Sequence, residues 1–207
     1  MTLRKYGIIT QINARRHYML EILIVVLVIA ADQATKAIAA KILPTLVDST
    51  YPLWEGVFHF TYVENRGAAF GMLQNKRIVF LVITSISIVL MIWLLISQRK
   101  RKPAAMPVLA RAGIALILAG AVGNMIDRIW LGYVRDMLSF TLINFAVFNV
   151  ADSAVCIGAA LTGISLLFTK KGKEYFDSID GEREKKKRNG GKDSADRESG
   201  NGDSGRG

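Results

Sequence analysis

The stretch IVFLVITSISIVLMIWLLI at residues 78–96 decides the fold class of this chain, because it contains no charged side chain. A helix that crosses the hydrocarbon core of a bilayer needs about 20 mainly apolar residues. The stretch meets that requirement in both length and composition. It therefore predicts a membrane-spanning helix, and the remaining question is how many more such helices the chain contains.

Three further apolar runs lie on either side of this stretch, at about 18–40, 107–126 and 145–168. The last run is interrupted by two polar residues, Asn149 and Asp152. Buried helices of a soluble protein are the alternative interpretation, but four runs of near-bilayer length disfavour it. We expect an all-α membrane protein whose domain, residues 18–168, contains four transmembrane helices.

The distribution of charge predicts the orientation of these helices. The chain contains 27 Lys and Arg and has a formal net charge of +10, and unopposed basic residues cluster in segment 1–17 and at 99–102. Under the positive-inside rule these segments and both termini face the cytoplasm, while the charge-balanced loop at 41–76 lies outside. The net charge does not indicate nucleic acid binding, because no folded basic domain would display it.

The first apolar run also resembles a secretory signal peptide, since it follows a basic start. However, Asp32, Gln33 and Lys36 separate its apolar core from the A-x-A match at 37–39. Such a site is poorly suited to cleavage. We therefore expect the first run to remain in the mature protein as a transmembrane helix.

The loop at 41–76 and the C-terminal end have their own patterns. Apolar and polar residues alternate along 58–63, which is typical of a half-buried strand and predicts a small extracytoplasmic β-sheet. The segment 65–71 lacks bulky apolar residues before Phe70, so Gly67 would let a bound peptide approach closely. The polar segment 169–207 predicts a disordered cytoplasmic tail.

Residues that commonly serve hydrolytic enzymes are scarce in this chain. Cys156 has no partner for an internal disulfide, and the two histidines, His17 and His59, are predicted on opposite sides of the membrane. No histidine cluster is therefore available for zinc, and a Ser-His-Asp triad would depend on His59 alone. We expect neither a metal nor another cofactor.

Two aspartates are the candidates for catalysis. Asp152 lies inside an apolar run, where an ionisable side chain is costly and is a functional candidate by default, although a structural role remains an alternative. Asp136 precedes it by 16 residues on the same predicted side, so the connection can fold back and bring the carboxyl groups together. Such a pair would share one proton and could activate water for peptide hydrolysis.

Other polar residues are spaced to support this pair. Asn is followed three residues later by Asp at Asn124 and Asp127, and again at Asn149 and Asp152, so each Asn could orient a carboxylate or a substrate carbonyl. Arg128 could pair with Asp127 or bind a lipid phosphate. A further spacing, Asp32 and Lys36 at i, i+4, predicts an intrahelical ion pair with a structural role.

The chain resembles the bacterial lipoprotein signal peptidases, or signal peptidase II. The resemblance covers roughly residues 20–168 and rests on five motifs in order, namely Asp32-Gln33-Ala34-Thr35-Lys36, Asn65-Arg66-Gly67-Ala68-Ala69-Phe70, Gly123-Asn124-Met125-Ile126-Asp127-Arg128, Val134-Arg135-Asp136-Met137 and Phe148-Asn149-Val150-Ala151-Asp152. It implies an aspartic endopeptidase of the bacterial plasma membrane whose catalytic pair is Asp136 and Asp152.

The same resemblance implies further roles. The substrates would be prolipoproteins with a diacylglyceryl-modified cysteine, cut just before that cysteine at the outer face of the membrane. The residues that would line the substrate site are Asn65, Asn124, Arg128 and Asn149, with Asp127 supporting it and Gly67 added from the loop composition. We expect a monomer whose other partners are membrane lipids.

Two other functions are compatible with aspartates in a membrane. A metal-dependent lipid phosphotransferase would need several clustered carboxylates to hold Mg²⁺, and only Asp127, Asp136 and Asp152 are close enough in sequence to consider. A small transporter would use Asp152 as a proton or cation site, but it would usually have internal symmetry that this sequence lacks. Both alternatives remain open at this point.

Overall fold

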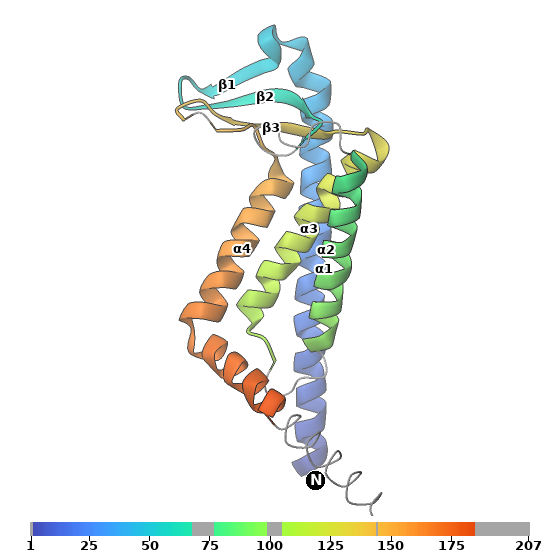
Figure 1. Ribbon diagram of the computed structural model, residues 1–207, viewed down its shortest axis with the longest axis vertical. Coiled ribbons are helices and arrows are strands. Elements are labelled where there is room, and N and C mark those ends of the chain that lie inside the picture. The colour runs from blue at the N-terminus through green and yellow to red at the C-terminus, as the bar shows by residue number, and fades with distance from the viewer. Residues whose placement is uncertain (1, 68–76, 99–104, 144, 185–207) are drawn as a thin grey trace, which may run out of the picture.

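Four long helices dominate the computed structural model, which describes residues 2–67, 77–98, 105–143 and 145–184 (Figure 1). Each of the four is long and apolar enough to cross a membrane. They are α1 (Thr2–Ile42), α2 (Arg77–Ser97), α3 (Val108–Trp130) and α4 (Val150–Phe168). This agrees with the expected multi-pass membrane protein.

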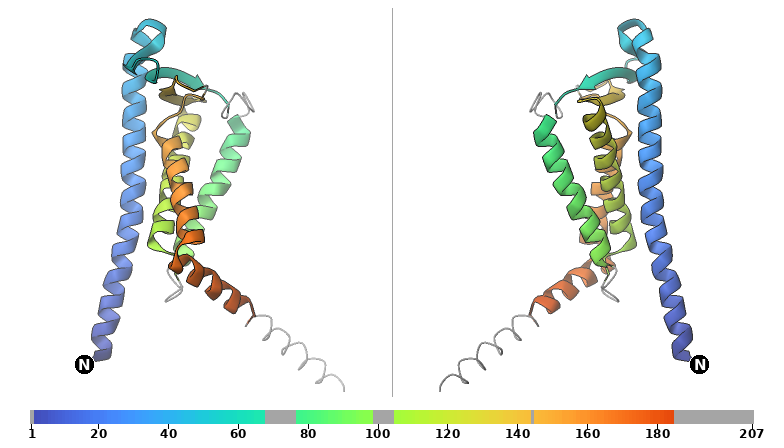
Figure 2. Two further views of the ribbon diagram at one scale, coloured as in Figure 1. Left: turned by 90° about the vertical axis from the view of Figure 1, so that its left-hand side faces the viewer. Right: turned by 90° about the vertical axis from the view of Figure 1, so that its right-hand side faces the viewer.

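The most buried of the four helices is α3, which packs against the other three. Figure 2 shows α3 and α4 between α1 on one side and α2 on the other. Close approach of α3 and α4 depends on small residues, as in many membrane helix pairs. A Cβ atom at Gly120 would overlap the carbonyl oxygen of Ala151, and one at Gly158 would overlap that of Gly113.

A three-stranded antiparallel sheet lies across one end of the helix bundle, which we call the sheet end (Figure 1). Its strands are β1 (Thr50–Trp54), β2 (Phe58–Asn65) and β3 (Val134–Phe140), in the order β1-β2-β3. Two short 3₁₀ turns, Leu43–Thr45 and Val47–Ser49, lead from α1 into β1. The strand predicted at 58–63 is thus present and slightly longer, whereas β3 was not anticipated.

Two helix starts differ from the sequence-based expectations. The first helix begins at Thr2 rather than near residue 18, so the basic segment continues the same helix. The fourth helix begins at Val150 rather than near residue 145, because Asn149 caps its N-terminus. Segments 68–76, 99–104 and 185–207, which include part of the predicted loop and tail, lie outside the described residues.

The prediction that residues 169–207 are disordered is wrong for residues 170–184, which form a helix. The physical reason is a short apolar face that the polar composition conceals. Tyr175 is buried against the core that includes Leu95 and Met106, and Ile179 packs against the same core. Gln98 Nε2 also lies 3.5 Å from the Tyr175 hydroxyl, which ties this helix to the end of α2.

Charged side chains are buried together where α1, α3 and β3 meet at the sheet end. Lys36 Nζ lies 2.9 Å from Asp32 Oδ2 and 3.7 Å from Asp127 Oδ2, and all three side chains are fully buried. Arg135 Nη2 donates to Asp127 Oδ1 at 2.7 Å. Asp32 Oδ1 accepts from the Ala151 backbone N–H at 3.0 Å, which extends the cluster to α4. The predicted Asp32–Lys36 ion pair is therefore confirmed.

Replacing Lys36 with Met should destabilise the protein strongly. The substitution leaves Asp32 buried without its cation, and breaking a buried ion pair in this way costs about 3–5 kcal/mol. Thermal unfolding of purified protein in detergent would measure the loss. Lys41→Met, at an exposed position of the same helix, is the matched control and should change the Tm little.

The double variant Asp32→Asn with Lys36→Met should be more stable than Lys36→Met alone. It removes one charge of each sign and leaves the Asp127–Arg135 pair intact. A Tm for Lys36→Met equal to that of Lys41→Met would contradict the view that neutralisation of this charge holds the sheet end together.

Candidate active site

The two predicted catalytic aspartates face one cavity at the sheet end of the bundle. Asp136 lies on β3 and Asp152 in the first turn of α4, and both line a cavity of about 530 Å³. Asn65, Gly67, Asn124 and Arg128 line the same cavity, together with Phe80, Phe140, Phe145, Phe148 and Cys156 among others. Residues far apart in sequence are therefore gathered around one space.

Strand pairing brings Asn65 to Asp136. In the register of β2 with β3, Asn65 lies opposite Val134 and Val63 lies opposite Asp136. Asn65 Nδ2 donates to Asp136 Oδ2 at 2.9 Å. The side-chain oxygen Oδ1 of Asn65 accepts from the Gly67 backbone N–H at 3.0 Å, which fixes the orientation of the Asn65 side-chain amide.

Asp152 is held by the start of α4 rather than by the strand. Asn149 is the N-cap residue, and its Oδ1 accepts from the Asp152 backbone N–H at 2.9 Å. The Asn149 backbone N–H donates back to Asp152 Oδ2 at 3.3 Å, which completes a capping box. The Asn-x-x-Asp spacing at this position is therefore the signature of a helix start.

Asn149 also connects the two carboxyl groups. Its side-chain Nδ2 donates to Asp136 Oδ1 at 2.7 Å and its backbone N–H donates to Asp152 Oδ2 at 3.3 Å, so one residue contacts both carboxyl groups. The side chain is fully buried. That Asn149 lines the substrate site stays a prediction, and its side-chain amide holds Asp136 from within the protein.

Asn124 and Lys36 hold the other side of Asp152. Asn124 Nδ2 donates to Asp152 Oδ1 at 2.8 Å. Lys36 Nζ donates to Asn124 Oδ1 at 2.8 Å, which determines which end of the amide faces the carboxylate. The repeated Asn therefore orients an aspartate, as expected, but the aspartate that Asn124 binds is Asp152 on the next helix and not the neighbouring Asp127.

The environment of Asp136 favours its protonated form. Burial raises the pKa of Asp136 to about 7, and the nearby charge of Asp152 adds to the rise. Hydrogen bonds from Asn65 and Asn149 oppose the rise because they stabilise the carboxylate. A carboxyl group with this pKa can hold a proton near neutral pH, as acid catalysis requires.

Arg128 lies at the wall of the cavity. Its Nη2 donates to the Gly67 carbonyl oxygen at 3.4 Å, and its guanidinium lies 4.7 Å from the centre of the Phe80 ring. Among the described residues the ion pairs of Asp127, in contrast, are with Lys36 and Arg135 and not with Arg128. Binding of a lipid phosphate by Arg128 stays a prediction.

Three residues of this region were not singled out from the sequence. Gln33 donates to the Gly123 carbonyl oxygen and accepts from Arg135, so it joins α1 to α3 and β3. The sequence indicated Gln33 and Arg135 only weakly, because both appeared only as parts of longer motifs. Phe80 had no signal at all, since it is one apolar residue within an apolar helix.

A family model and the similar known proteins all point to one family. The family model for signal peptidase (SPase) II matches residues 24–168. A lipoprotein signal peptidase of Caldanaerobacter subterraneus subsp. tengcongensis is 46% identical over 147 residues, covering 71% of this chain and 95% of that protein. Another, from Clostridioides difficile, is 43% identical over 151 residues, covering 72% of this chain and 96% of that protein.

Solved structures agree with these relatives. A bacterial membrane enzyme structure determined by the in meso method at 2.3 Å resolution aligns with a TM-score of 0.63 and 34% identity, covering 71% of this chain and 87% of that chain. The matched segment 24–168 includes both aspartates and every side chain that binds them. The chain therefore belongs to the signal peptidase II family.

Proposed function

We propose that Asp136 and Asp152 are the catalytic pair with which this chain removes signal peptides from diacylglyceryl-modified prolipoproteins, by cutting just before the lipidated cysteine. As a member of its family, the chain is a lipoprotein signal peptidase and an aspartic endopeptidase. The observation that supports the residue assignment is that Asn149 binds both carboxyl groups, through its side-chain Nδ2 to Asp136 and through its backbone N–H to Asp152.

The surroundings of the two aspartates support different roles for them in this proposal. Asp152 lies at the N-terminus of α4, where the helix dipole and the Asn149 backbone N–H stabilise a negative charge. Asp136, with a pKa of about 7, retains the proton that the pair shares. Asp152 then acts as the base that takes a proton from the attacking water, and Asp136 donates to the carbonyl oxygen of the scissile bond.

After the water has added, the protons must return in the opposite direction. The tetrahedral intermediate loses its amine when Asp152 passes the proton to the leaving nitrogen, while Asp136 recovers its own from the hydroxyl group. The products are a carboxylic acid and a new N-terminal cysteine. Asn65, Asn124 and Asn149 remain in place as donors throughout, so they act as positioning residues.

The walls of the cavity suit a peptide that is attached to lipid. Gly67 and Arg128 lie on one side, and Phe140, Phe145 and Phe148 provide apolar surface beside the aspartates. Cys156, one helical turn from Asp152 on α4, also lines the space, so the cavity extends along a membrane-spanning helix. A substrate anchored by acyl chains can therefore reach the aspartates from within the bilayer.

The distribution of charge supports a site on the outer side. Unopposed basic residues in 1–17 and at 99–102 favour the cytoplasm, and the sheet end lies at the other end of these helices. The proposal therefore places both termini in the cytoplasm and the catalytic pair at the outer face of a bacterial plasma membrane. The protein would act as a monomer on substrates that diffuse laterally.

Asp136→Asn and Asp152→Asn should each reduce cleavage of a diacylglyceryl-modified prolipoprotein by at least about a hundredfold, because each removes one partner of acid–base catalysis. Gel-based detection of the released signal peptide would measure this. Asp48→Asn, at an exposed position of the sheet end, is the matched control and should cleave normally.

A chelator should leave the rate of the parent protein unchanged, because the mechanism uses only carboxyl groups and water. Normal cleavage by either aspartate variant would sink the catalytic assignment. A parent protein that is inactive on the lipidated substrate but intact by thermal unfolding would instead argue against the substrate.

The pH dependence of kcat/KM should show an alkaline limb near pH 7. Below this pH Asp136 is protonated and can act as the acid, whereas above it both carboxyl groups are charged and the acid is lost. Asn65→Ala should move this limb to higher pH, because the lost hydrogen bond stabilised the charged form of Asp136. Thr61→Ala, on the same strand, is the control, and a limb that moves to lower pH in Asn65→Ala would contradict the assignment.

A further inference from the structure

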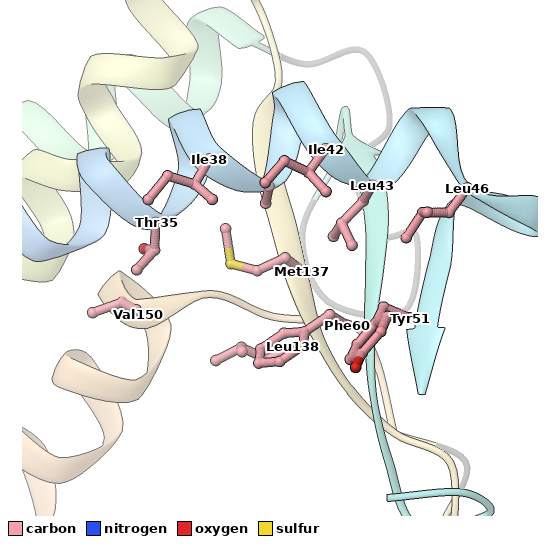
Figure 3. Close-up of a pocket in the computed structure, with 11 residues that line it drawn as sticks. Thr35, Ile38, Ile42, Leu43, Leu46, Tyr51, Phe60, Met137, Leu138 and Val150 are labelled. Atoms are coloured by element: carbon pink, nitrogen blue, oxygen red, sulfur yellow. The ribbon is translucent and has the colours of Figure 1, made fainter. Parts of the chain in front are cut away.

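A second hollow lies at the sheet end, where Met137 and Leu138 of β3 line it. This groove has a volume of about 350 Å³ and runs between the end of α1 and the sheet (Figure 3). Ile38, Ile42 and Leu43 lie along one side of it, and Met137 and Leu138 lie along the other (Figure 3). Its size falls within the range of roughly 300–1,000 Å³ typical of small-ligand sites.

The lining of the groove restricts the chemistry of its occupant. The lining residues include no charged side chain, and only Thr35 and Tyr51 have a side-chain oxygen. The Thr35 hydroxyl already donates to the backbone carbonyl oxygens of Ala31 at 2.8 Å and Asp32 at 2.9 Å. Water is a poor occupant of such a space, because it needs several polar partners. An alkyl chain packs against these apolar side chains and needs no hydrogen bond.

The groove is continuous with the surface that α1 presents to lipid. Ile38 is 58% exposed and Ile42 is 51% exposed, so the side of the groove formed by α1 opens away from the protein. Met137 and Leu43 are buried and form the inner wall. The candidate membrane span of α1 runs from Met19 to Thr45, so Ile38 and Ile42 at this opening lie within it.

We propose that the groove binds one acyl chain of a bilayer phospholipid, which enters sideways between α1 and β3. Inside the groove a chain contacts protein atoms on several sides, whereas on a convex helix surface it contacts them on one side only. Dispersion contacts therefore favour the groove over the general lipid-facing surface. Without a chain the same residues would line a void and lose these contacts.

The occupied groove supports the catalytic strand, and this step rests on the proposed function. Successive residues of a strand point to opposite faces. Asp136 lines the catalytic cavity and Met137, the next residue of β3, lines the groove. Val150, which follows Asn149 at the start of α4, also lines it. A bound chain therefore packs directly behind both elements that position the aspartates.

Photo-crosslinking with a phosphatidylglycerol whose acyl chain contains a diazirine tests the proposal in vesicles. Mass spectrometry should find adducts on 35–46 and on Met137 or Leu138 in about fivefold excess over those on Val89 and Leu90, which face outward from α2. That excess corresponds to a preference of about 1 kcal/mol over bulk lipid. Equal labelling of groove and α2 surface would overturn the proposal.

Two variants fill the groove with protein. Ala39→Phe places a ring at its inner wall, and Ile42→Trp, at a half-exposed position, covers it with less risk to folding. Each should reduce adducts in the groove about fivefold while labelling of α2 persists. Val26→Phe, on the lipid-facing side of α1, is the matched control and should label as the parent does. Unchanged groove labelling in a folded Ile42→Trp would also overturn the proposal.

Crosslinking requires no peptidase activity, so failure of the proposed function would leave this result readable. A lipidated prolipoprotein peptide added to Asp152→Asn should leave the groove labelled. Loss of labelling would mean that the substrate's own chains occupy the groove, which overturns the phospholipid assignment. For the link to catalysis, phospholipid added to protein in lipid-poor detergent should raise cleavage by the parent but not by Ile42→Trp, and an equal response would contradict that link.

Discussion

A buried ammonium group at the end of a membrane-spanning helix must be neutralised by the protein, and this constraint organises the sheet end. Lys36 is fully buried, and its partners come from α1 through Asp32 and from α3 through Asp127 and Asn124. An unpaired charge in such surroundings would be very costly. Arg135 then brings β3 to Asp127. The elements that surround the cavity of Asp136 and Asp152 are thus held together by one set of compensating charges.

At the sheet end, two aspartates have charged partners and two others have neutral partners. Asp32 and Asp127 bind cations directly, whereas Asp136 and Asp152 receive hydrogen bonds from asparagine amides. A cation in direct contact with a carboxyl group would keep it ionised. A neutral amide orients the carboxyl group but changes its pKa less. Asn124 binds both Lys36 and Asp152, so a neutral side chain lies between the ammonium group and this carboxyl group.

The helices were predictable because a bilayer imposes a length and a composition that the sequence displays openly. The contacts at the site were not. Along β3 both faces are covered, since Val134, Asp136 and Met137 are all buried, so the strand lacks the alternation that revealed β2. The Asn149 cap could have been found from its spacing to Asp152, but that spacing equally fits two residues on one helix face. Tyr175 was concealed because one buried aromatic residue suffices to dock a polar helix.

The two faces of β3 explain why a polar site and an apolar groove lie so close together. A strand places neighbouring side chains on opposite sides, so Asp136 and Met137 belong to different environments although their backbones are adjacent. On a helix the two side chains would point only about 100° apart, so the groove and the carboxyl group would be less fully separated. Placing Asp136 on a strand and Asp152 on a helix therefore gives the pair two unlike supports. The strand separates Asp136 from lipid, while the helix start supplies Asp152 with backbone donors.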